Sequence, residues 1–291
     1  MIQTVTNIDR RTFYEKYVVP GKPVLIKGGI NNWPAVSKWN YDYFMDIGQS
    51  LKVPIKTGDL TKGTKIVMSL AEYTALLKQH ESELAAQRPV SKAPYLHDVP
   101  IFLMMPQLKD DISSFPVDLL PSWYGNNWWK FVQFFMGSSN SLTPLHFDTL
   151  CTHNLFFQIQ GSKRFYMVKA SDWKKCYLNS WRWADVDLET PDFEKFPLLK
   201  DAERGDVVVD GGDILFMPSG TLHQVRGLSY SISFNIDWHT RQSVTKGLLS
   251  GFRGAPMQNV FYNGVVATGL YFGVPSRYLF KYYQSYLNYV S

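Results

Sequence analysis

The stretch Ser141–Asp148, which reads SLTPLHFD, decides the fold, because it ends in a His-x-Asp triplet formed by His146 and Asp148. In an extended chain residues i and i+2 point to the same face, so a strand here would direct both side chains toward a single ion. A second histidine, His223, follows much later, at the end of GDILFMPSGTLH. This separation is too long for a local finger or a helical histidine pair. It suits a barrel in which a late strand returns beside an earlier one.

His146, Asp148 and His223 are therefore the candidate metal ligands and catalytic residues. Two imidazoles and one carboxylate form the protein's half of a non-haem Fe(II) site, which leaves coordination positions open for a co-substrate and oxygen. These donors suit Fe(II) without the soft thiolates that favour zinc. We expect all three side chains to converge on one ion.

The composition describes an ordinary globular chain. Its 291 residues are 45% hydrophobic and can bury a full core as one domain. The net charge of +5 permits acidic partners, but it comes without the Lys/Arg cluster of a nucleic-acid site. The two cysteines form no CxxC pair, which favours a reducing compartment. The start is polar, and no stretch approaches the roughly 18 apolar residues of a membrane span, so we expect a soluble cytoplasmic protein with no membrane partner.

The first part of the chain predicts helices around one strand. The pattern predicts a helix over residues 7–17 with Asn7 as its cap, a strand over 23–27, a loop opening at Trp33-Pro34, and helices over 41–48 and 70–87 capped by Asn40 and Ser69.

From residue 128 the pattern becomes that of strands. Candidate strands lie within residues 130–137, 141–148, 154–160, 163–168, 207–225 and 229–238, and the two-residue joint Gly161-Ser162 predicts a hairpin. Beyond Thr240 the period is helical. The expected fold is mainly β, a double-stranded β-helix barrel of the cupin or jelly-roll type with N-terminal helices. We expect a catalytic domain over residues 1–240 and a C-terminal helical extension over 241–291.

Five segments in this order resemble the JmjC-like cupins, the cupin-8 group of 2-oxoglutarate- and Fe(II)-dependent hydroxylases. They are KPVLIKGGINNWPA, YLHDVPI, SLTPLHFD, FFQIQGSKRF and GDILFMPSGTLHQV. The resemblance implies Fe(II), 2-oxoglutarate and O2 as cofactor and co-substrates, with succinate and CO2 released. It also implies that Lys163 holds the distal carboxylate of 2-oxoglutarate, and that Thr143, Asn154 and Asn235 lie close to this co-substrate.

The chain departs from the asparaginyl hydroxylases of that family at two places. The segment Thr149–His153 is longer by two residues, and Thr221-Leu222 replaces an aromatic pair before the distal histidine. These differences leave the candidate metal ligands and Lys163 unchanged, but the substrate of those relatives does not carry over to this chain.

Other chemically conspicuous residues are expected to be structural. We expect His97, His153 and His239 to be surface or core histidines, and Cys151 to be a small buried hydrophobe rather than a nucleophile. The two tryptophan clusters, which are Trp123, Trp128 and Trp129 and then Trp181 and Trp183, are expected to pack in the core or at its rim.

The predicted function is an Fe(II)- and 2-oxoglutarate-dependent oxygenase that hydroxylates an unactivated C–H bond, with a peptide or protein side chain as substrate. A small amino-acid-like or natural-product molecule and RNA remain alternatives. A non-oxidative metal-binding cupin is the alternative of another class. Lys163 together with Thr143 argues against it, because neither residue is needed unless a co-substrate is anchored. The absence of a chromatin-reading module or basic tail argues against a histone demethylase.

A homodimer built by the C-terminal helix is also predicted. Leu279, Tyr283, Tyr286 and Val290 follow one another at helical spacing and cover one face of a helix. The alternative is that this stripe packs on the chain's own barrel.

Overall fold

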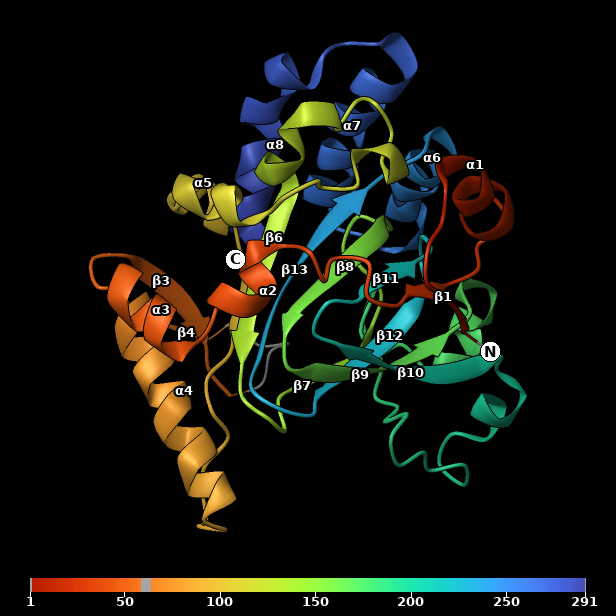
Figure 1. Cartoon of the computed structure of the whole chain (residues 1–291). Helices are drawn as coiled ribbons and strands as arrows, with labels where there is room; N and C mark the ends of the chain where they lie inside the picture. The colour runs from red at the N-terminus through yellow and green to blue at the C-terminus, as the bar shows by residue number, and fades with distance from the viewer. Residues whose placement is uncertain (1, 59–63, 291) are drawn as a thin grey trace.

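The computed structural model describes residues 2–58 and 64–290, without the side chains of residue 126 and of residues 287–290. In this part of the chain two sheets pack face to face (Figure 1). One has the order β1-β2-β11-β8-β13-β6-β5 and the other β10-β9-β12-β7, with a separate β3-β4 hairpin. Except for the parallel pair β1 and β2, the pairings are antiparallel. The predicted double-stranded β-helix with helical decoration is confirmed.

The strand bounds agree with most of the sequence pattern. The seven-stranded sheet contains β1 Gln3–Val5, β2 Val24–Ile26, β5 Leu96–Val99, β6 Val132–Gly137, β8 His153–Gln160, β11 Ile214–Met217 and β13 Ser231–Trp238. The four-stranded sheet contains β7 Leu142–His146, β9 Ser162–Val168, β10 Arg204–Asp210 and β12 Leu222–Gly227. The separate hairpin contains β3 Lys52–Lys56 and β4 Lys65–Ser69.

Gly161 is a corner between the sheets rather than the turn of a hairpin. β8 pairs with β11 and β13, whereas β9 pairs with β10 and β12, so the hairpin predicted for residues 154–168 is wrong. A two-residue joint indicates a sharp turn, but it does not say whether the chain returns to the same sheet. Gly161 has φ +71°, and a Cβ there would clash with the backbone oxygen of Tyr230. Glycine is therefore required where the chain crosses over.

The helices of the first half follow their caps. α3, Tyr41–Ile47, begins at Asn40, and α4, Leu70–Ala85, begins at Ser69 with a capping box closed by Glu72, as predicted. α1, Arg10–Phe13, continues as a π-helical turn over Tyr14–Val18. Two predictions are wrong in this region, and each has a local cause.

The first wrong prediction is the cap of α1. Asp9 rather than Asn7 is the cap, because its Oδ1 accepts the backbone N–H of Thr12 at 3.0 Å. The second is the loop at Trp33-Pro34, where the chain instead begins α2, Pro34–Lys38. Proline is well suited to the first helical position because it needs no N–H donor there.

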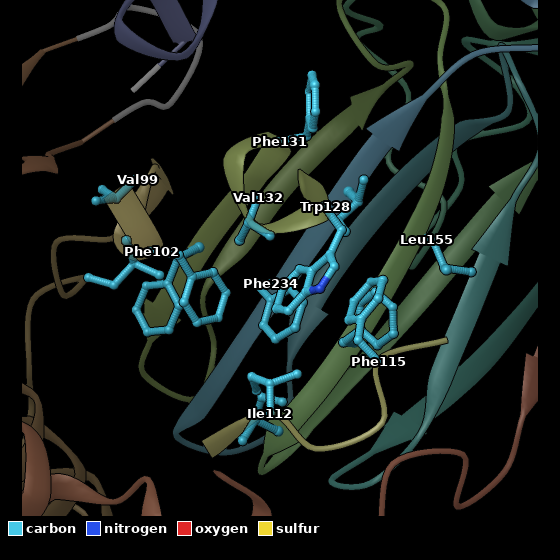
Figure 2. Close-up of a cluster of buried hydrophobic side chains, with 14 of the residues drawn as sticks. Val99, Phe102, Ile112, Phe115, Trp128, Phe131, Val132, Leu155 and Phe234 are labelled. Atoms are coloured by element: carbon cyan, nitrogen blue, oxygen red, sulfur yellow. The ribbon is translucent and has the colours of Figure 1, made fainter. Parts of the chain in front are cut away.

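The outer face of the seven-stranded sheet is covered by an aromatic core (Figure 2). Leu155 and Phe157 of β8 point outward into this core, whereas Phe156 points inward to the other sheet, as the period of two requires. Trp128 stacks on Phe115 with centroids 4.0 Å apart, which confirms that this tryptophan packs in the core. Both faces of β8 are thus buried, and its polar residues are held at fixed positions.

The chain ends in helices that cover one end of the barrel (Figure 1). They are α6 Arg241–Leu249, α7 Met257–Phe272 and α8 Ser276–Val290. The short helix α5, Ile101–Met104, lies between β5 and β6 in the sequence. Short 3₁₀ segments occupy Pro106–Asp111, Val117–Leu119, Gly125–Phe131, Ala170–Cys176, Pro197–Asp201 and Ser250–Arg253. No helix within the described ranges is both long enough and apolar enough to cross a membrane.

The stripe predicted as a dimer seam is used inside the chain itself. Tyr283 and Tyr286 are 2% and 1% exposed and pack against Phe131 and Tyr262. The seam as predicted is therefore wrong, because two of its members have no surface left for a partner. The side chain of Val290 lies outside the described residues. The homodimer itself stays a prediction.

Candidate active site

The three predicted metal ligands meet at the open end of the four-stranded sheet. His146 ends β7 and is the direct cross-strand neighbour of His223 in β12, with ring centroids 4.4 Å apart. One ligand atom from each of His146, Asp148 and His223 lies within 4.8 Å of the others. The predicted convergence is thus present, although β7 ends at His146 and Asp148 follows it in a turn.

Both histidines present the same nitrogen to this cluster. His146 Nδ1 lies 2.8 Å from the carbonyl oxygen of Pro144, and His223 Nδ1 lies 3.1 Å from that of Thr221. Because a carbonyl oxygen only accepts, each Nδ1 carries a hydrogen, and Nε2 is the nitrogen left to face an ion. Burial holds the pKa of His146 well below its usual range, so this ring is neutral. Two imidazole nitrogens and one carboxylate fit a divalent iron ion.

The ring of Trp183 supports this arrangement from outside. It stacks on His146 with centroids 4.6 Å apart, and the two residues also form an isolated β-bridge. The backbone N–H of Phe147 donates to the carbonyl oxygen of Arg182. The predicted packing role of Trp183 is therefore specific, since it restrains a candidate ligand.

Lys163 is a buried cation at the other end of the same cavity. It is 2% exposed, and its Nζ donates to Ser233 Oγ at 2.8 Å and to Tyr95 Oη at 3.1 Å. The rings of Tyr95, Phe135 and Phe156 surround it at 5.7, 5.5 and 5.3 Å. Among the described residues it forms no ion pair with a carboxylate. Desolvation lowers its pKa to about 7.

One cavity brings together all of the predicted site residues. It is lined by the three candidate ligands, Lys163, Thr143, Asn154 and Asn235. Thr143 lies three positions before the end of β7 and lines the cavity. The two asparagines also line the cavity, and their NH2 groups donate to carboxyl groups: Asn154 to Asp148 and Asp237, and Asn235 to Asp237.

Sequence reasoning missed several residues of the cavity wall. They are Tyr95, His97, Asp98, Gln133, Arg182, Asp237 and Tyr286. His97, expected to be a surface or core histidine, is partly buried and lines this wall beside Asp98, at a register shift in β5. Asp98 has φ +61°, which non-glycine residues rarely adopt outside strained or functional positions. The segment YLHDVPI was the available signal, but the bulge cannot be seen in it.

The cluster around Asp98 is a compact polar network. His97 Nδ1 lies 2.6 Å from Asp98 Oδ2, and Lys56 Nζ lies 3.3 Å from the same oxygen. Desolvation lowers the pKa of His97 to about 4, so its ring is neutral near pH 7. A charged Asp98 and a neutral His97 thus face the cavity.

The other conspicuous residues have structural roles, as predicted. His153 stacks on both Phe216 and Trp238, and its Nδ1 accepts the backbone N–H of Ser219 at 3.1 Å. His239 is buried beside Ser243. Burial raises the pKa of the Cys151 thiol to about 11, which leaves it protonated and unreactive near neutral pH.

An antiparallel two-sheet barrel with a 2-His-1-carboxylate donor set in its mouth defines a metal-binding cupin. The chain belongs to the cupin-like domain family, Cupin_8, which it matches over residues 10–244, and it is similar to JmjC proteins.

Several curated proteins are similar to this chain. JmjC domain-containing protein D of Dictyostelium discoideum is 27% identical over 242 residues, covering 76% of this chain and 52% of that protein. Lysine-specific demethylase JMJ30 of Arabidopsis thaliana is 28% identical over 233 residues, covering 78% of this chain and 52% of its own length. The human tRNA wybutosine-synthesizing protein 5 is 25% identical over 257 residues, covering 81% of this chain and 77% of that protein. The chain thus spans about half the length of the first two relatives.

Proposed function

We propose that this protein is an Fe(II)- and 2-oxoglutarate-dependent oxygenase that hydroxylates an unactivated C–H bond and releases succinate and CO2. The single observation that carries the proposal is Lys163, a buried cation without a carboxylate partner in the described chain, in the cavity that also holds the metal-ligand cluster. A buried charge without a counter-ion is costly. An external dicarboxylate that reaches from Lys163 toward the ligands would remove that cost.

In this proposal one set of cavity residues binds the iron and another set binds 2-oxoglutarate. His146, Asp148 and His223 would hold the iron, which when bound activates O2 for oxidation of 2-oxoglutarate and substrate. Lys163, Tyr95 and Ser233 would bind the distal carboxylate through a cation and a hydroxyl pair. Phe135, Phe156 and the rest of the apolar wall exclude water from this ion pair and so strengthen it.

We propose a peptide or protein side chain as the substrate. The lysine-specific demethylases among the relatives are named for protein substrates. A small amino-acid-like molecule remains an alternative, and the relative named for tRNA wybutosine synthesis keeps RNA among the candidates. Substrate would meet the wall formed by His97, Asp98 and Arg182, since the iron and 2-oxoglutarate ends use other residues.

The activity is tested by measuring succinate from 2-oxoglutarate with purified protein. We expect turnover that needs both added Fe(II) and O2, and that rises when a peptide, RNA or small-molecule pool contains the substrate. A non-oxidative cupin would bind metal and release no succinate under any of these conditions.

The buried lysine makes 2-oxoglutarate binding depend on pH. Below a pH of about 7 Lys163 is already charged, and above it the site must take up a proton when the anion binds. The affinity should therefore be constant below about pH 7 and then fall as pH rises, by at most roughly tenfold per pH unit. Calorimetry at pH 8 in two buffers of different ionisation enthalpy should detect the proton uptake. Lys163→Arg, whose side chain stays charged, should show none; buffer-independent heat for the wild type would refute the prediction.

We propose a homodimer formed through the outer face of α8 rather than its inner stripe. Tyr278 and Tyr282 are 57% and 47% exposed and lie one turn apart on the same face. Tyr278→Glu with Tyr282→Glu should give a folded monomer by light scattering, whereas Tyr286→Glu should unfold the chain, because it places a charge in the core. A monomeric wild type at micromolar concentration would end this proposal.

A further inference from the structure

Asp148 belongs to no strand, so other residues must orient its carboxylate. It lies beyond the end of β7, in a turn closed by the backbone N–H of Cys151, which donates to the Asp148 carbonyl oxygen at 2.8 Å. Its two carboxylate oxygens have different surroundings. Oδ1 lies 3.7 Å from His223 Nε2, within the ligand cluster, and Oδ2 accepts the side-chain N–H of Asn154 at 3.2 Å. One oxygen therefore faces the metal position and the other is held by Asn154.

Asn154 is itself held by a second carboxyl group. It is the cross-strand neighbour of Asp237, and its Nδ2 lies 3.1 Å from Asp237 Oδ1. Asn235 Nδ2 lies 3.4 Å from the same oxygen. Asn154 and Asp237 are 2% and 3% exposed, so neither is free to turn toward solvent. The three side chains form a chain of contacts from β13 to Asp148.

The orientation of the Asn154 amide follows from this arrangement. Both hydrogens of its NH2 group are directed to carboxyl oxygens, and a flipped amide would place an acceptor oxygen against two other acceptors. The amide oxygens of Asn154 and Asn235 have no hydrogen-bond partner in the described chain, which is the consequence of turning both NH2 groups toward the acids. Asp237 accepts through Oδ1 whether its carboxyl is ionised or protonated, so its hold on Asn154 does not depend on its charge.

We propose that Asp237 is a positioning residue for the metal: through Asn154 it keeps Asp148 a ligand by Oδ1 alone. This inference rests on the proposed function. If Oδ2 were released, the carboxylate could rotate and offer both oxygens to the ion, which would occupy a coordination position that a co-substrate or oxygen needs. The contacts from Asp237 through Asn154 to Asp148 thus keep a coordination position of the ion open, and they also strengthen metal binding.

The test compares Asp237→Leu with Asp237→Asn, which are similar in size but differ in the acceptor oxygen. Using Co(II) as the probe, affinity is measured by competition with a chelator, and the visible absorption of the bound ion reports its coordination. Loss of a supporting contact of this kind typically costs roughly 10- to 100-fold in metal affinity. We expect that loss, with a changed spectrum, in Asp237→Leu and near wild-type behaviour in Asp237→Asn. Lys163→Met is the matched control, since it should weaken 2-oxoglutarate binding and leave Co(II) affinity unchanged.

A double-mutant cycle separates the loss of these contacts from general damage to the fold. Asn154→Leu should lose about as much Co(II) affinity as Asp237→Leu, and the double variant should lose no more than either alone. Wild-type affinity in a folded Asp237→Leu, or losses that add, would overturn the inference. If the leucine variants do not fold, the same cycle is run with alanine. A wild type that binds no Co(II) and makes no succinate would instead refute the proposed function.

Discussion

Asp148→Ala, His146→Ala and His223→Ala each abolish succinate production from 2-oxoglutarate. Each change removes one of the three donor atoms that lie within 4.8 Å of one another, and two remaining ligands leave the ion exposed to exchange with solvent. The fold should persist, because the apolar core clusters are built from other residues. Circular dichroism and thermal unfolding check the fold, and succinate release by each variant checks the loss.

Asp46→Ala is the matched control for the loss of a carboxylate. Asp46 is exposed on α3 and does not line the cavity, so its removal should leave turnover unchanged. Turnover that survives Asp148→Ala would remove this cluster from the mechanism.

Lys163→Ala is expected to raise the 2-oxoglutarate requirement by roughly a hundredfold or more. Breaking a buried charge pair typically costs about 3–5 kcal/mol, because the remaining charge is left without its partner. Metal affinity should hardly change, since Lys163 contacts Tyr95 and Ser233 rather than the ligands. Lys163→Arg should restore binding only in part, because a planar guanidinium does not reproduce the reach of an ammonium group. Apparent affinities from succinate production at varied 2-oxoglutarate concentration measure the effect.

Lys163→Met is the control that keeps the volume of the side chain and removes only its charge. It should bind 2-oxoglutarate as poorly as Lys163→Ala and unfold at no lower temperature than the wild type, because burial of a cation costs free energy. Unchanged 2-oxoglutarate affinity in both variants would mean that another cation anchors the co-substrate. Among the other cations, Arg164 faces Asp206 and Lys130 lies over Trp129, whereas Arg182 lines the cavity.

The candidate metal and co-substrate residues, which the structure brings to one cavity, could be named from the sequence because their signals are local. The His-x-Asp triplet keeps His146 and Asp148 close together just where β7 ends, and a short motif identifies Lys163. Tyr95 and Asp237 could not be predicted, since they are placed by pairing with residues distant in sequence, Lys56 and Asn154 respectively. The direction in which Asp98 points depends on the register shift in β5. Such an irregularity changes the face of the sheet on which the following side chains lie, and the sequence does not reveal it.

The same distinction applies to the fold. Asn40 and Ser69 were predicted as caps because a cap depends on a few neighbouring residues. The sequence around Gly161 predicts a hairpin where the structure has a corner, because the residues of a tight turn do not show which sheet the next strand will join. Tyr283 and Tyr286 show a similar limit, since an apolar helix face predicts burial without saying whether the same chain or a second copy covers it.

The central claim is that one cavity holds Fe(II) through His146, Asp148 and His223 and 2-oxoglutarate through Lys163. Anaerobic titration of the protein with Fe(II) and then 2-oxoglutarate tests it most directly, because the weak visible charge-transfer band of the chelate needs both at once. We predict that the band forms with the wild type, is lost in Asp148→Ala, and forms in Lys163→Ala only at much higher 2-oxoglutarate concentration. Absence of the band from folded, iron-loaded wild-type protein at saturating 2-oxoglutarate would contradict the claim.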